Sequence, residues 1–205
     1  MNLKNSLTLF AFLIALVIGT QTQAQSEMPQ PSPAASVSQV VGFTKISIDY
    51  SSPGVKGRKI FGELLPYGTT WRAGANAPTK ITFSTGVKIG GKDVRPGSYS
   101  LMVKPMKNGD WVVYLHEEGK SVYNYMKDNK IDETKLASEA VVSVKVKPQM
   151  SDYAMERLAY MISAGDNKTA TVMLGWDKVW LSMEVDTKAD QNMKRIEAAF
   201  QQPEN

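Results

Sequence analysis

Residues 51–80 form a glycine-rich segment that concentrates the side chains able to bind an anion. The segment contains one acidic residue, Glu63, and five basic residues, Lys56, Arg58, Lys59, Arg72 and Lys80. Arg58 and Arg72 can each form bidentate hydrogen bonds with a carboxylate, sulfate or phosphate group, and Lys59 adds positive charge. Its five glycines allow backbone N–H groups to approach a ligand closely. This composition predicts a site for a polar, anionic ligand.

The same segment contains residues that suit the uncharged part of such a ligand. Tyr67 and Trp71 could stack on a sugar ring or another flat apolar face, and Asn76 could orient the ligand. The candidate ligand-binding residues are therefore Arg58, Lys59, Tyr67, Trp71, Arg72 and Asn76. A structural alternative stays open, in which the segment closes one end of the fold. In that alternative the arginines bond to backbone carbonyls and the core is plugged by Phe61, Leu64, Leu65 and Trp71.

Catalytic residues are harder to find in this sequence. His116 is the sole histidine and cysteine is absent, which excludes a multi-histidine metal site, thiolate ligands, disulfides and a thiol nucleophile. No G-x-S-x-G motif supports a hydrolase. The adjacent acids at 117–118 and 132–133 are typical of solvated turns. We expect no catalytic residue, metal or cofactor; a metal-independent hydrolase that uses a carboxylate pair or His116 is the alternative.

The elements that must position these residues are predominantly strands. Apolar residues alternate in short runs separated by turn signals, and no long helix separates the runs. The predicted strands cover residues 43–50, 81–83, 87–94 as a hairpin, 99–103, 111–115, 140–146, 155–162, and 169–174 with 179–185 as a second hairpin. This pattern predicts an all-β fold, an antiparallel β-sandwich of jelly-roll-like type.

One amphipathic helix is predicted at the C-terminus, within residues 188–205. Thr187 and Asp190 resemble a capping box, and apolar residues recur at helical spacing at Met193, Ile196 and Phe200. We expect the helix to dock on the sandwich; the alternative is a structural or assembly protein that offers this helix to a partner. We expect core positions for Trp111, Trp176, Trp180 and the methionines at 150, 155, 161, 173 and 183.

The N-terminal residues predict export. Lys4 precedes an apolar run at 7–18, and small residues end at Ala24, as in a cleaved signal peptide (1–24). Residues 25–36 are polar and proline-rich and predict a flexible linker, followed by the folded domain at 37–187. We therefore expect a periplasmic or secreted protein without a transmembrane segment after cleavage. The net charge of +4 is concentrated in residues 51–80, which argues against a nucleic-acid partner.

Five motifs together resemble a known bacterial family. They are SPGVKGRKIFG (52–62), LLPYG (64–68), WRAGANAPT (71–79), GSYSL (97–101) and WVVYL (111–115). They are similar to the signature of the family called domain of unknown function 2911, over about residues 35–186. The resemblance implies an exported domain found in Bacteroidota-like bacteria, without an established activity, and Ala73 stands where the family often has Thr. We expect a non-catalytic binding or accessory module for a glycan or cell-envelope fragment.

Overall fold

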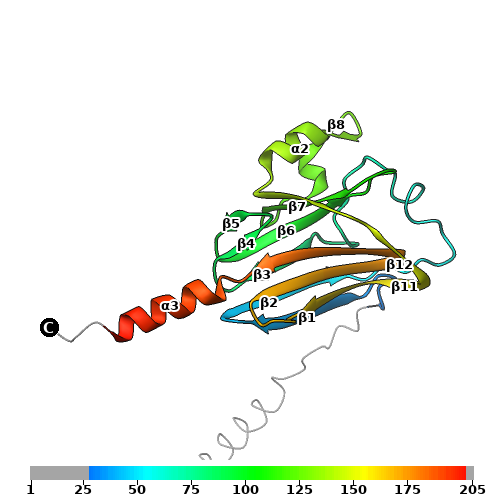
Figure 1. The fold of residues 1–205 in the computed structure, drawn as a ribbon. Coiled ribbons are helices and arrows are strands. Elements are labelled where there is room, and N and C mark those ends of the chain that lie inside the picture. Colours follow the sequence, from blue (N-terminus) through cyan, green and yellow to red (C-terminus); the bar gives the residue numbers. More distant parts are fainter. Residues whose placement is uncertain (1–27, 202–205) are drawn as a thin grey trace, which may run out of the picture. The chain divides into compact units, whose positions relative to one another are not determined.

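The computed structural model describes residues 28–201 and contains two antiparallel sheets that face each other (Figure 1). The six-stranded sheet has the order β1 (Ala34–Val41), β2 (Thr44–Ser51), β3 (Thr79–Phe83), β6 (Gly97–Lys104), β7 (Trp111–Glu117) and β10 (Val142–Val146). The second sheet has the order β11 (Gln149–Ser163), β12 (Thr169–Asp186), β4 (Val87–Ile89) and β5 (Lys92–Val94). The predicted all-β sandwich is confirmed.

The core lies between the sheets because each sheet turns one apolar face inward. In β2, Ile46 and Ile48 are fully buried, while the intervening Ser47 and the neighbouring Lys45 are not. Leu174 in β12 belongs to the same buried cluster, which joins both sheets. Each large aliphatic side chain buried this way contributes about 1.5–3 kcal/mol to the free energy of unfolding. The period-2 pattern therefore positions the strands and the loops between them.

β12 turns back on itself, as the predicted hairpin requires. Its two ends meet, because the backbone N–H of Thr187 donates to the carbonyl oxygen of Lys168 at 3.0 Å. The turn includes Asp177, whose φ of 53° lies in the left-handed region. Near the turn, a side chain at Gly175 would meet the ring of Trp180 at 2.9 Å. The label β12 therefore covers two arms, one before and one after Asp177.

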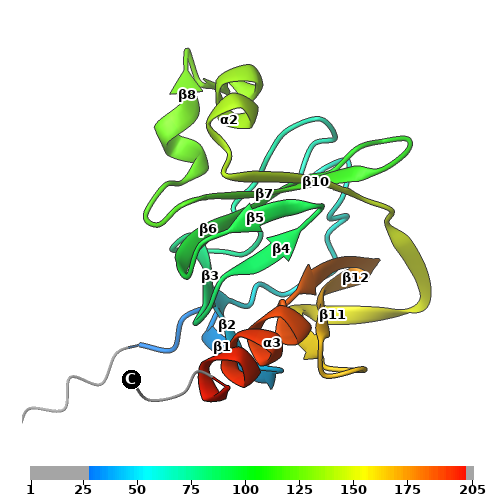
Figure 2. The same cartoon turned by 60° about the vertical axis from the view of Figure 1, so that its left-hand side comes forward.

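A small helical insertion follows β7 and was not predicted. It contains the 3-10 helix η1 (Val122–Tyr125), the short hairpin β8 (Met126–Lys127) and β9 (Lys130–Ile131), and α2 (Glu133–Glu139). In both views, α2 and β8 lie on the far side of β7 from β12 (Figures 1 and 2). A second buried cluster joins the insertion to the sheet: Met102, Tyr114, Val122, Tyr125 and Leu136. β6 and β7 are therefore buried on both faces.

The C-terminal helix α3 (Ala189–Phe200) exists, but its predicted docking is wrong. None of its residues is buried, and Met193, Ile196 and Phe200 are exposed. The predicted capping box is also absent: the N-cap residue is Lys188, without a side-chain cap. The hydroxyl of Thr187 instead donates to the carbonyl oxygen of Lys168 at 2.6 Å.

Other expectations differ from the structure at single positions. Met150 and Met161 are 73% and 48% exposed, so these two methionines are not core residues, whereas Met183 is buried. β1 begins at Ala34, before the expected start of the folded domain at 37. The predicted signal peptide (1–24) lies outside the described residues. No helix within residues 28–201 is long and apolar enough to cross a membrane.

Candidate functional site

The structure does not bring Arg58, Arg72 and Asn76 together. The Arg58 guanidinium donates to two carbonyl oxygens of its own loop, those of Gly54 at 2.6 Å and Val55 at 3.1 Å. The Asn76 side chain donates to the carbonyl oxygen of Ser32 at 3.1 Å. Arg58 therefore fixes the local loop, and Asn76 ties the loop to the segment before β1.

Arg72 contacts the helical insertion instead. Its Nη1 donates to the Tyr123 hydroxyl at 2.8 Å, and its guanidinium carbon lies 5.7 Å from the centre of the Tyr123 ring. The Arg72 Nε is buried and has no hydrogen-bond partner among the described residues. Arg72 thus lies apart from both Arg58 and Asn76 in its contacts.

Trp71 is a core residue. Its side chain is 7% exposed, and its ring centre lies 5.6 Å from that of Trp176. The backbone of Trp71 pairs with Val103 of β6 through two hydrogen bonds of 2.9 and 3.0 Å. Phe61 is equally buried. For these two aromatic residues the structural alternative holds, since both close the core, whereas Leu64 is exposed.

Lys59 and Tyr67 do meet at one cavity, which we call the end pocket. It has a volume of about 370 Å³ and lies where four connections converge. They are the glycine-rich segment 51–80, which we call the signature loop, the β6–β7 turn, the β10–β11 junction and the turn of β12. Its lining is Lys59, Phe61, Tyr67, Met106, Lys107, Gly109, Trp111, Pro148, Met150, Asp177, Lys178 and Val179. Pockets of about 300–1,000 Å³ are typical of small-molecule sites.

The end pocket has an apolar floor that the core holds in place. Phe61 and Trp111 pack with ring centres 4.8 Å apart, and Val179 beside them is buried. The indole N–H of Trp111 donates to the carbonyl oxygen of Met106 at 2.9 Å. The floor therefore presents apolar ring and methyl surface while its one indole donor is already satisfied.

Tyr67 forms a partly exposed wall, and Gly62 determines its position. Gly62 has a φ of 93°, and a Cβ placed there would lie 2.7 Å from the Tyr67 ring. The backbone N–H of Gly68 donates to the carbonyl oxygen of Pro105 at 2.7 Å, which joins the loop to the β6–β7 turn. Only glycine at 62 therefore lets the ring lie against the backbone with 41% of Tyr67 exposed.

The charges of the end pocket favour an anion. Lys59 forms an exposed ion pair with Glu63 at 3.1 Å, so its charge is partly compensated. Lys107 and Lys178 form no ion pair with any residue in the described part of the chain, and Asp177 is the single acid of the lining. The lining thus sets the ammonium groups of Lys107 and Lys178 against one carboxylate, that of Asp177, beside an apolar floor.

His116 lies away from this pocket and from the loop acids. Its side chain is 1% exposed, and its Nδ1 forms a hydrogen bond of 2.9 Å with the Tyr125 hydroxyl of η1. Burial lowers the pKa of His116, with an opposing contribution from Glu139. The Nε2 atom is buried without a partner in the described residues. This environment favours a neutral imidazole that joins the insertion to the sheet.

Sequence reasoning missed one contact that positions the loop. The carboxylate of Glu133 in α2 accepts hydrogen bonds from the Thr70 backbone N–H and hydroxyl, each at 2.7 Å. Lys104 of β6 pairs with the same carboxylate at 3.1 Å. One signal in the sequence pointed to the helix that carries Glu133. Asp132 is the N-cap residue of α2, and its side chain accepts a hydrogen bond from the N–H of Lys135 at 2.9 Å.

The comparison with family models explains why the loop motifs occur together. The model described as "Protein of unknown function (DUF2911)" matches residues 32–185. The chain belongs to this family. Neither the search of curated proteins nor that of solved structures gave a match. The family match spans both sheets and the insertion, so the end pocket lies within the family domain.

Within the family domain, the structure also shows what Ala73 does. Ala73 is fully buried and has a φ of 52°. Its carbonyl oxygen accepts hydrogen bonds from the Tyr160 hydroxyl at 2.7 Å and from the Thr79 hydroxyl at 3.0 Å. The backbone at this position is therefore the polar group in use, and its side chain faces the core.

Proposed function

We propose that this chain is a non-catalytic binding module for a small anionic amphiphile, held in the end pocket. The observation that carries the proposal is the meeting of Lys107 and Lys178, two lysines without an ion pair to any described residue, with the apolar floor of Phe61 and Trp111. An anionic head group would lie near the lysines while an acyl or aromatic body covers the floor. Tyr67 would close the body from the side.

The lining narrows the ligand class that the sequence suggested. Met106, Pro148, Met150 and Val179 offer apolar surface, whereas the hydroxyls of a glycan need hydrogen-bonding partners when they leave water. The pocket offers one exposed phenol ring as a sugar platform, that of Tyr67. These features favour an acyl carboxylate or phosphate, such as a fragment of a cell-envelope lipid, over an acidic glycan.

In this proposal the protein is exported from the cytoplasm. The first 24 residues have the charge, apolar run and small residues of a signal peptide. Export would bring the pocket into contact with envelope lipids and their breakdown products. This link between compartment and ligand is part of the proposal.

Calorimetric titration with three probes tests the ligand class. Octanoate carries both an anion and an apolar chain, 1-octanol lacks the anion, and galacturonate lacks the chain. We expect octanoate to bind most tightly. Equal affinity for 1-octanol would show that the lysines do not contribute to binding. Tighter binding of galacturonate would favour an acidic glycan as the ligand.

Variants locate the site in the same experiment. We expect the double variant Lys107→Gln with Lys178→Gln to lower the affinity for octanoate by about fivefold to thirtyfold. This is the effect of losing one or two exposed ion pairs of about 1 kcal/mol each. Lys45→Gln with Lys92→Gln, at exposed lysines of β2 and β5, is the charge-matched control and should leave binding unchanged. Arg72→Ala should also leave it unchanged, since Arg72 does not line the pocket.

A further inference from the structure

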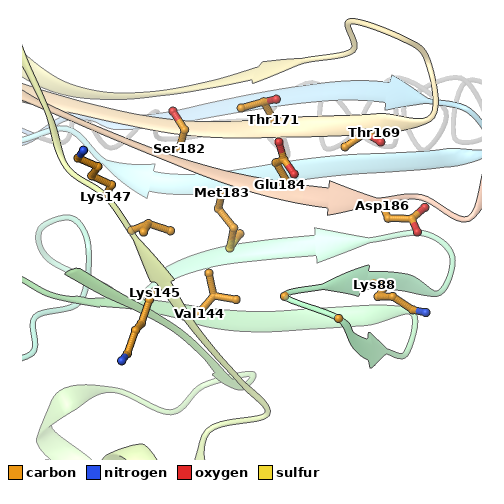
Figure 3. A pocket seen from close by; sticks show the side chains of 13 residues that line it. Lys88, Val144, Lys145, Lys147, Thr169, Thr171, Ser182, Met183, Glu184 and Asp186 are labelled. Atoms are coloured by element: carbon orange, nitrogen blue, oxygen red, sulfur yellow. The ribbon is translucent and has the colours of Figure 1, made fainter. Parts of the chain in front are cut away.

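A second cavity, which we call the side groove, lies between β10 and the second arm of β12 (Figure 3). It has a volume of about 600 Å³, and none of its residues belongs to the end pocket. The turn between β4 and β5 also lines it, through Gly90 and Gly91. There, a side chain on Gly90 would overlap Val144, so glycine allows the turn to lie directly against β10.

Two strand edges face the side groove. Within residues 28–201, β10 is the last strand of its sheet and pairs with β7 alone. The second arm of β12 pairs with β4 only through Asp186 and Lys88. The edge of residues 182–185 that faces away from the first arm of β12, and the outer edge of β10, therefore offer backbone N–H and C=O groups that no other described strand takes up. An extended peptide is the ligand that satisfies such groups.

The two edges cross obliquely in Figure 3, so a straight peptide can follow only one of them. Four consecutive residues of the β10 side line the groove, from Val144 to Lys147. A peptide along β10 would present its opposite side to Ser182 and Glu184. Hydroxyl groups of Thr169, Thr171 and Ser182 lie across the groove and could hydrogen-bond with peptide groups.

The ends of the side groove carry opposite charges. Lys147 lies at one end, and Glu184 and Asp186 lie toward the other (Figure 3). Lys88 is opposite Asp186 in register and lines the same end, so the two carboxylates and this one ammonium group give that end a formal charge of −1. The groove therefore presents a cation to one end of a ligand and a net anion to the other.

We infer that the side groove binds a short peptide with free termini, its carboxylate near Lys147 and its ammonium group near Glu184 and Asp186. The open strand edge recognises the backbone, and the charge separation recognises the two ends. This site is distinct from the end pocket and does not depend on the anionic amphiphile. Lysines on a sheet edge can also serve only to prevent pairing with other strands. In that case tetraalanine would not bind.

Titration of the full chain with tetraalanine and two capped forms tests the inference. We expect free tetraalanine to bind, and N-acetylation or C-amidation each to weaken it about fivefold, the effect of one exposed ion pair. Absence of binding at millimolar concentration, or equal affinity of free and capped peptides, would overturn the inference.

Two variants assign the ends. Glu184→Gln should abolish the difference between free and acetylated peptide while keeping the difference between free and amidated peptide. Lys147→Gln should do the reverse. Glu118→Gln and Lys45→Gln are exposed, charge-matched controls that should keep both differences. If both groove variants lost the same difference, or neither lost any, the assigned orientation would be wrong.

Discussion

The carboxylate of Glu133 holds Thr70 by two hydrogen bonds of 2.7 Å, one to its backbone N–H and one to its hydroxyl. Glu133 belongs to the insertion and Thr70 to the signature loop, so this contact joins the two. Lys104 pairs with the same carboxylate. Both charged side chains are largely shielded from solvent, with Lys104 20% and Glu133 23% exposed. The insertion thus fixes the signature loop at Thr70, close in sequence to Tyr67 of the end pocket.

Glu133→Gln should therefore destabilise the protein. An amide keeps one acceptor oxygen, but it loses the second charged hydrogen bond and leaves Lys104 without its partner. We expect the free energy of unfolding to fall by about 1–2 kcal/mol, measured by urea denaturation. Glu118→Gln, which removes an equal charge from an exposed position, should change it little; equal losses in the two variants would refute the anchor.

Gly62→Ala should damage both stability and ligand binding. The left-handed φ of 93° costs about 1–2 kcal/mol for a residue with a Cβ, and the added carbon displaces the Tyr67 ring. Gly57→Ala is the matched control, because Gly57 has a φ of 68° and open space around its Cβ position. Both variants should lose stability in denaturation, but only Gly62→Ala should weaken octanoate in calorimetry.

The buried His116 makes stability depend on pH. Burial lowers its pKa in the folded state below the ordinary value of 6.5, so the unfolded chain binds more protons between the two values. The free energy of unfolding is therefore highest above about pH 6.5 and falls as the pH decreases toward the lowered pKa. The imidazole faces Tyr125 and Tyr114, with Glu139 and Lys120 as the nearby charges.

Denaturation at about pH 7 and about pH 5 measures this effect. His116 is the sole histidine, so His116→Gln should lose most of the pH dependence over this range, whatever its stability at neutral pH. A wild-type protein of equal stability at both pH values would contradict the buried neutral imidazole.

The strands were predictable because their core contacts repeat along the chain. Ile46 and Ile48, or Leu101 and Val103, alternate with residues on the other face, and the pairing partner is not needed to see it. The same alternation failed for Met150, whose strand runs past the core at the β10–β11 junction. The alternation of apolar residues shows which residues share one face of a strand. It does not show where the strand extends beyond the core.

The candidate site was only partly predictable. Lys59 and Tyr67 line the end pocket, but their neighbours Lys107 and Lys178 come from turns distant in sequence. Arg72 and Trp71 adjoin in sequence yet lie in different surroundings, one against Tyr123 and the other in the core. Which residues share a pocket depends on long-range pairing, and a single sequence does not encode that in its spacing.

Indole N–H resonances of the ¹⁵N-labelled protein test the end pocket most directly. The chain has four tryptophans, and Trp111 forms part of the pocket floor while Trp71 lies in the core. Octanoate, added below its micelle-forming concentration, should shift the Trp111 signal in a saturable way and leave Trp71 nearly unchanged. A Trp111 signal that stays in place throughout the titration would contradict binding in the end pocket.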